Sequence, residues 1–185
     1  MSMIRAFVAL DLPYELKGTL AAAVERLTER NRGVRWVRPE GMHLTLKFLG
    51  DIPETDVQPI AGDLDVAAGP CSPLRLRLSG FGAFPGPKKA RVVWVGVSGD
   101  TEALGSLAKR VDEACASHGI PRERRPFAGH ITLGRLRVPS VVDLRVEPVQ
   151  GAFVAEEIVL YRSELSPGGA RYTPLHKSRL KGTGG

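Results

Sequence analysis

Cysteine is scarce in this sequence. Only Cys71 and Cys115 occur, they form no CxxC pair, and their spacing is not typical of a metal site. Two isolated cysteines indicate neither a disulfide framework nor a zinc knuckle. This cysteine usage fits a reducing compartment, and we expect a cytoplasmic protein.

Long hydrophobic runs are also lacking. The apolar run from Ala6 to Leu10 lies between Arg5 and Asp11 and is too short for the apolar region of a signal peptide. No other run approaches the roughly 20 residues that a helix needs to cross a bilayer. We therefore expect a soluble, unprocessed protein that does not bind membranes.

Acidic residues are outnumbered by basic ones. Lys and Arg total 26 against 20 Asp and Glu, which gives a formal net charge of +6. This balance favours an anionic partner, and nucleic acid is the leading candidate. The basic segments 88–91 and 122–125 can follow an RNA backbone without reading its sequence. The alternative interpretation is a basic surface that only meets solvent.

The apolar periodicity predicts an α+β domain. Helices are expected after Pro13, over 53–69 with Pro59 in the first turn or outside the helix, and from Asp100 or Thr101 to Gly119. Strands are expected over 3–11, 34–37, 42–50, 74–79, 92–97, 130–138, 152–165 and 171–180, with a Gly/Pro-rich loop over 81–87. We expect a single bilobal domain over 1–180, with two antiparallel sheets, outer helices and a central groove, and a flexible tail over 181–185.

A short motif occurs twice, as His43-Leu44-Thr45-Leu46 and as His130-Ile131-Thr132-Leu133. In a strand, the His and Thr of each motif share one face and the apolar pair faces the core. Two such strands side by side would place two imidazoles and two hydroxyls in one groove. This set suits acid–base chemistry on a phosphate. Taken alone, one such motif is more simply a core strand that carries a structural histidine.

With both motifs in place, the sequence resembles the 2H phosphoesterase superfamily, named for its paired HxTx motifs. Within it, the sequence is similar to the RNA 2′,3′-cyclic phosphodiesterases, also called 2′-5′ RNA ligases. The resemblance covers nearly the whole chain, through RAFVALDLP, RWVRPEGMHLTLKFLGDI, ARVVWVGV, RPFAGHITLGRLR and LYRSELSPGGARYTPL. One departure is Gly129, where many relatives carry a bulkier residue or proline before the second motif.

The resemblance implies a 2H phosphoesterase-like fold that hydrolyses an RNA terminal 2′,3′-cyclic phosphate to a 2′-phosphate. It implies that His43 donates a proton to the 3′ oxygen, that His130 accepts one from water, and that Thr45 and Thr132 hold the phosphate oxygens. The motifs are nearly symmetric, so the residues themselves leave the two histidine roles open. Two imidazoles can be held with one neutral and one protonated, so no metal or other cofactor is expected.

Arg135 matches a basic position of the second family motif and is implied as a phosphate-binding residue. Simple alternation would point it away from His130, so its use in the site requires an irregular strand. Gly134 would permit a β-bulge there. The alternative is a solvated arginine at the end of a strand.

Three alternative functions stay open at this stage. The same site run backwards would act as a 2′-5′ RNA ligase. A non-catalytic RNA-binding module would use the motif strands only as a scaffold. A metallohydrolase ranks last, because the sequence has no HExxH motif or carboxylate-rich cluster. We expect a monomer whose partner is RNA with a 2′,3′-cyclic phosphate end.

Overall fold

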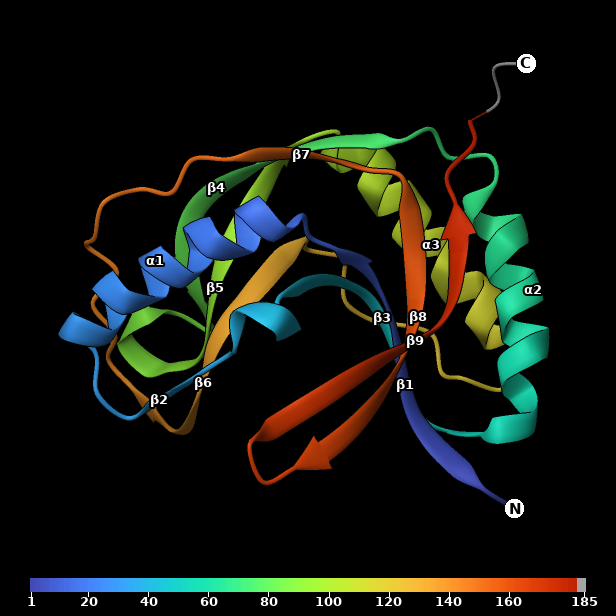
Figure 1. Cartoon of the computed structure of the whole chain (residues 1–185), viewed down its shortest axis with the longest axis horizontal. Coiled ribbons are helices and arrows are strands. Elements are labelled where there is room, and N and C mark those ends of the chain that lie inside the picture. The colour runs from blue at the N-terminus through green and yellow to red at the C-terminus, as the bar shows by residue number, and fades with distance from the viewer. Residues whose placement is uncertain (183–185) are drawn as a thin grey trace.

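The computed structural model describes residues 1–182 and has an α+β fold, as predicted (Figure 1). In this part of the chain the helices are α1 (Tyr14–Arg30), α2 (Val57–Ala68) and α3 (Thr101–Ala116). The strands are β1 (Met3–Asp11), β2 (Val34–Trp36), β3 (His43–Pro53), β4 (Leu74–Phe84), β5 (Ala90–Gly99), β6 (His130–Ser140), β7 (Ala152–Ala155), β8 (Glu157–Ser166) and β9 (Gly169–Arg179).

The strands form one curled antiparallel sheet, so the expectation of two separate sheets is wrong. Their order is β7-β4-β5-β6-β3-β1-β8-β9, and β2 pairs with β6. The two expected sheets are joined where β3 meets β6 at a single residue pair, Leu44 with Ile131. Beyond that pair, β2 takes the place of β3 alongside β6, with Trp36 opposite Gly134. The fold therefore brings the two motif strands together at the centre of the sheet.

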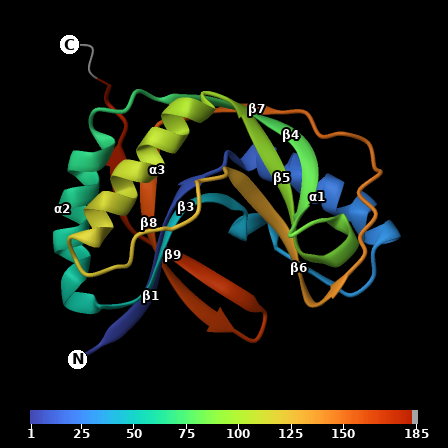
Figure 2. The ribbon, with the colours of Figure 1, turned by 180° about the vertical axis from the view of Figure 1, so that it is seen from behind.

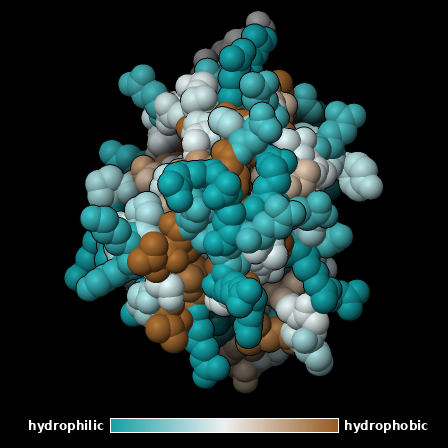
Figure 3. All heavy atoms as spheres, turned by 90° about the vertical axis from the view of Figure 1, so that its left-hand side faces the viewer, coloured by the Kyte–Doolittle hydropathy of each residue, from teal (hydrophilic) through white to brown (hydrophobic). Residues whose placement is uncertain are grey.

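The three helices cover the sheet on its outer side (Figures 1 and 2). α2 and α3 lie side by side next to β3, β8 and β9, and α1 lies over the half that contains β4, β5 and β6. The apolar stripe of α1 is buried, whereas the face of the molecule that includes α1 is mostly hydrophilic (Figure 3). None of the described helices is long and apolar enough to cross a membrane.

Two predicted segments differ from the structure. Segment 81–87, predicted as a loop, is strand up to Phe84, because β4 continues past an irregularity between Leu78 and Phe81. The predicted strand 152–165 is divided at Glu156 into β7, which pairs with β4, and β8, which pairs with β1. The apolar pattern of this stretch indicates strand but carries no information about the strand partner, and the two pieces bind opposite halves of the sheet.

The described C-terminus lies against the end of α2. The backbone N–H of Gly182 donates to the carbonyl oxygens of Gly69, at 3.1 Å, and Cys71, at 2.9 Å. The remaining residues of the expected tail, 183–185, lie outside the described part of the chain.

Candidate active site

The central strands place the four motif side chains on one face of the sheet. Leu44 and Ile131, the residue pair that joins β3 to β6, are both fully buried. Side chains alternate along a strand, so the residues flanking this pair point to the opposite, solvent-facing side. In an antiparallel register each histidine then faces the threonine of the other strand, His43 with Thr132 and Thr45 with His130.

Both histidines are held in the same way. His43 Nδ1 lies 2.7 Å from the Gly41 carbonyl oxygen, and His130 Nδ1 lies 2.8 Å from the Ala128 carbonyl oxygen. A carbonyl oxygen only accepts hydrogen bonds, so Nδ1 carries the proton and donates it in each ring. Nε2 is then the atom left to exchange a proton with a substrate.

The ring of His43 is enclosed by aromatic side chains. It stacks on Phe7 with ring centres 4.7 Å apart, and Tyr172 meets it edge-on at 5.3 Å. Burial lowers the pKa of His43 from 6.5 to about 4, although the Gly41 carbonyl and Asp11 oppose this change. His43 is therefore neutral at pH 7 in the substrate-free protein.

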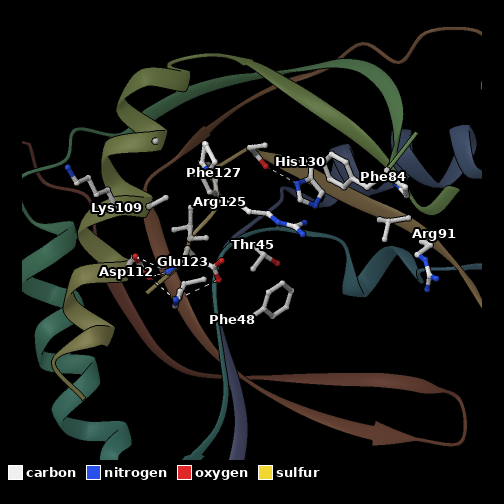
Figure 4. A pocket seen from close by; sticks show the side chains of 18 residues that line it. Thr45, Phe48, Phe84, Arg91, Lys109, Asp112, Glu123, Arg125, Phe127 and His130 are labelled. Atoms are coloured by element: carbon white, nitrogen blue, oxygen red, sulfur yellow. Dashed lines mark hydrogen bonds and ion pairs between the residues drawn. The ribbon is translucent and has the colours of Figure 1, made fainter. Parts of the chain in front are cut away.

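The surroundings of His130 are more open. Phe84 meets its ring edge-on at 5.0 Å, and the ring of Trp94 lies 6.3 Å away. His130 and Thr45 line a cavity of about 1040 Å³ that extends toward α3 (Figure 4). This volume is at the upper end of the range for pockets that bind drug-sized ligands, so the cavity can hold more than a phosphate group. A smaller cavity of about 170 Å³ lies beside His43.

Arg135 lies on the same face as the motif histidines because β6 is irregular. Trp94 of β5 pairs with Thr132, but the preceding residue, Val93, pairs with Gly134, so β6 has one extra residue between them. This shift reverses the alternation and returns Arg135 to the face of Thr132. Burial is the main cause that lowers the pKa of His43, and the positive charge of Arg135 lowers it slightly further. The irregularity expected at Gly134 is confirmed.

The first motif strand has the same kind of irregularity. Ala9 of β1 pairs with Thr45, but Val8 pairs with Lys47, so β3 also has one extra residue after its threonine. Phe48 thereby takes the position in β3 that Arg135 takes in β6, and its side chain is 60 % exposed. Lys47 points to the buried side instead.

Sequence reasoning missed several residues of the site. Tyr172 comes from the distant strand β9, and no local pattern indicates that it reaches His43. Phe48 could have been found by aligning the two motifs, since it occupies the position of Arg135. The basic segment 122–125 was expected to follow an RNA backbone, and the structure places one of its arginines, Arg125, in the lining of the cavity.

Metal ligands do not gather in the described structure. Among residues 1–182, no three His, Cys, Asp or Glu side chains lie together as a metal ion would require. Near the site, Asp11 pairs with Lys17 at 3.0 Å, and Asp112 pairs with Lys47 at 2.7 Å. Each of these two carboxylates is thus paired with a lysine.

Comparison with known proteins gives a consistent result. The family described as LigT like Phosphoesterase matches residues 10–94 and 95–172. The chain is 32 % identical to the RNA 2′,3′-cyclic phosphodiesterase of Methanothermobacter thermautotrophicus, over 96 % of this chain and 99 % of the relative. A crystal structure from Thermus thermophilus covers 98 % of this chain and all of its own, with 33 % identity and a TM-score of 0.83. E. coli LigT complexed with 3′-AMP covers 97 % of this chain and 99 % of its own, with 28 % identity and a TM-score of 0.78.

Proposed function

Because the chain belongs to the family of LigT-like phosphoesterases, we propose that it is an RNA 2′,3′-cyclic phosphodiesterase. The observation that supports this most directly is the pairing of the motif strands at Leu44 and Ile131, which sets two histidines and two threonines around one point. A relative that matches nearly the whole chain is named for this activity. The proposed product is RNA that ends in a 2′-phosphomonoester.

The proposed reaction uses one histidine on each side of the phosphorus. Water attacks phosphorus in line with the 3′ oxygen, so a new P–O bond forms as the P–O3′ bond breaks. His130 Nε2 accepts the proton of the water, and His43 Nε2 donates a proton to the departing 3′ oxygen. The proton that His130 takes up balances the proton that His43 gives up, and proton exchange with solvent restores both imidazoles. Acid–base steps of this kind typically contribute about 10²- to 10⁴-fold each.

His43 must gain a proton before it can act as the donor. Its low pKa in the free protein comes mainly from burial, which disfavours the charged imidazolium. An anionic cyclic phosphate beside the ring favours the imidazolium, so substrate binding raises the pKa of His43 and couples proton uptake to binding. His130 remains the base in the open part of the site.

The remaining residues bind the phosphate and the RNA. Thr45 and Thr132 donate hydrogen bonds to the non-bridging oxygens, and Arg135 neutralises the charge that builds up on them. Preorganised donors of this kind act without any metal ion. We expect a cytoplasmic monomer whose partner is RNA with a cyclic phosphate end.

Hydrolysis of a defined RNA tests the proposal. An oligonucleotide with a labelled 2′,3′-cyclic end is incubated with the protein in excess chelator, and the position of the phosphate in the product is identified. We expect a 2′-phosphate, which the His130→Ala variant should form about 10²- to 10⁴-fold more slowly. A 3′-phosphate would contradict the assigned leaving group, and loss of activity in chelator that a divalent ion restores would indicate a metallohydrolase.

The reverse reaction is tested in the same assay. An acceptor RNA with a free 5′ hydroxyl is added in excess, and the products are separated by length. Because water is far more abundant than the acceptor, we expect hydrolysis to dominate. A joined product that accumulates faster than the 2′-phosphate would identify a 2′-5′ RNA ligase. Binding of the RNA without either product would identify a non-catalytic RNA-binding module.

A further inference from the structure

A charged lysine is buried on the opposite side of the motif strand from the histidines. Lys47 is 3 % exposed, and its Nζ lies 2.7 Å from Asp112 Oδ1 and 3.7 Å from Glu123 Oε1. Nζ also donates to the carbonyl oxygen of Pro121 at 2.6 Å. A buried charge is costly unless it is paired and hydrogen-bonded. The contacts of Lys47 meet that condition, and they all connect β3 to α3 and to the segment after it.

These contacts fix the loop that leads from α3 into β6. The backbone N–H of Glu123 donates to both carboxylate oxygens of Asp112, at 3.2 and 3.3 Å. Pro121 and Glu123 are therefore attached to the same buried cluster. Further along the loop, the Ala128 carbonyl accepts the hydrogen bond that orients His130. The cluster around Lys47 thus anchors the segment that enters the second motif.

Arg125 follows Glu123 by two residues and is directed into the site. Figure 4 shows its side chain running from the loop toward His130, with Thr45 nearby. Arg125, Thr45 and His130 all line the large cavity. A guanidinium group presents a planar fork of donors that matches two oxygens of a phosphate. The position of Arg125 is therefore suited to an anion held between the two motif strands.

We propose that Arg125 binds the reacting phosphate and that Lys47 is the positioning residue that holds Arg125 there through the loop. This inference rests on the proposed function. As water adds to phosphorus, negative charge increases on the non-bridging oxygens, and Arg125 faces them from the loop while Arg135 faces them from β6. Two cations on different elements stabilise the transition state more than the monoanionic cyclic phosphate.

Arg125→Gln tests the first half of the inference. We expect kcat/KM for an RNA dinucleotide with a 2′,3′-cyclic end to fall about 10- to 100-fold, the usual effect of losing a hydrogen bond to a charged group. Arg32→Gln is the control with the same change of charge, since Arg32 is exposed in the loop after α1 and is not among the described residues that line the cavity. It should change kcat/KM less than twofold. Equal losses in the two variants would show a general charge effect and overturn the inference.

An uncharged linkage identifies which phosphate Arg125 binds. The same dinucleotide is made with a methylphosphonate between its two nucleosides, so that the cyclic phosphate carries the only negative charge. If Arg125 binds the reacting phosphate, Arg125→Gln reduces the rate by the same factor on both substrates. A loss confined to the charged linkage would assign Arg125 to the upstream phosphate and refute its proposed role.

A double-mutant cycle tests the role of Lys47. We expect Lys47→Met to lower kcat/KM, and Lys47→Met combined with Arg125→Gln to be little worse than Arg125→Gln alone. Asp112→Asn provides a second variant if Lys47→Met does not fold, because it alters the same cluster with little change in shape. Additive losses would mean that Lys47 contributes only to stability, and would overturn its assignment.

Binding gives a readout that is independent of turnover. The affinity for RNA ending in a 2′-phosphate is measured for the wild type, Arg125→Gln and Arg32→Gln. We expect weaker binding only for Arg125→Gln. If the wild type does not hydrolyse a cyclic end, the proposed function fails, but this measurement still tests Arg125. Equal affinities in all three proteins would refute the inference.

Discussion

The two motif strands have the same pattern in different surroundings. In both, the histidine donates from Nδ1 to a carbonyl two residues earlier, and an extra residue follows the threonine. His43 is stacked on Phe7 with its pKa lowered to about 4, whereas His130 lies at the edge of a large cavity. The repeated motif thus fixes the geometry of the pair, and the neighbouring side chains give its two members different surroundings.

The residues after each threonine extend this contrast. Phe48 and Arg135 occupy matching positions on the exposed face, and Lys47 and Gly134 occupy matching positions on the other face. The first half thus presents an aromatic ring to the site and the second half presents a cation.

The largest effect is expected from the histidines. His43→Ala and His130→Ala should each lower kcat by about 10²- to 10⁴-fold, because each removes one acid–base step. The double variant should lose far less than the product of the two factors, since residues that act as a unit are not additive. Near-wild-type hydrolysis by either variant would refute the two-histidine mechanism and leave that motif as a structural strand.

The pH profile shows the difference between the two halves. His43 is the proton donor, so the active form is lost as the pH rises through its pKa, and kcat/KM of the free enzyme should show an inflection near pH 4. His43→Ala should lose the alkaline decline of kcat/KM if measurable activity remains, because the variant has no donor that must stay protonated. A wild-type profile without an inflection near pH 4 would mean that the surroundings of His43 do not hold it neutral.

A smaller effect is expected on stability. The pKa of His43 is lowered from 6.5 to about 4 on folding, so the unfolded chain binds the proton more tightly. The contribution of neutral His43 to the free energy of unfolding is present above pH 6.5. It is lost as the pH falls toward 4, which lowers the free energy of unfolding by at most about 3 kcal/mol. His43→Gln should remove this part of the pH dependence in urea unfolding, and His130→Gln is the control. If the free energy of unfolding depended on pH equally in the wild type and in His43→Gln, the prediction would be contradicted.

Much of this site follows from the sequence because its residues are close together in the chain. Alternation within each motif places the His and Thr on one face, and the conflict between alternation and the use of Arg135 predicts the irregularity at Gly134. The helices also follow from local patterns, including the first-turn position of Pro59 in α2. These features depend on neighbours a few residues apart.

The features that could not be predicted from the sequence depend on contacts between distant segments. The single sheet requires Leu44 to pair with Ile131, and neither strand carries a local signal for that partner. Tyr172 reaches His43 only because β9 pairs with β8, and β8 with β1. Lys47 has the sequence pattern of a solvated strand residue, and its burial depends on Asp112 and the loop after α3.

Gly134 takes the position in β6 that Lys47 takes in β3, but it has no side chain, and adding one should lower the stability of the protein. A Cβ at Gly134 would lie 2.6 Å from Val34 Cγ1 and 2.8 Å from Trp36 Cε3. Gly134→Ala should therefore destabilise the protein by about 1–3 kcal/mol, through overpacking. Gly80→Ala is the control, since a Cβ at Gly80 has no neighbour within 4 Å. Equal urea midpoints for the two variants would show that β2 and β6 accommodate a side chain at Gly134.

The smallest effect is expected from the threonines. Thr45→Val and Thr132→Val keep the shape of the side chain and remove one hydroxyl donor, which is worth about 1 kcal/mol, or roughly fivefold in rate. A threonine hydroxyl does not titrate near neutral pH, so both limbs of the pH profile should remain. The two losses should be similar, because each threonine faces the histidine of the other strand at the same Leu44–Ile131 pair. A loss in one variant only would show that the asymmetry of the histidines extends to phosphate binding, and loss of a limb would contradict the assigned role.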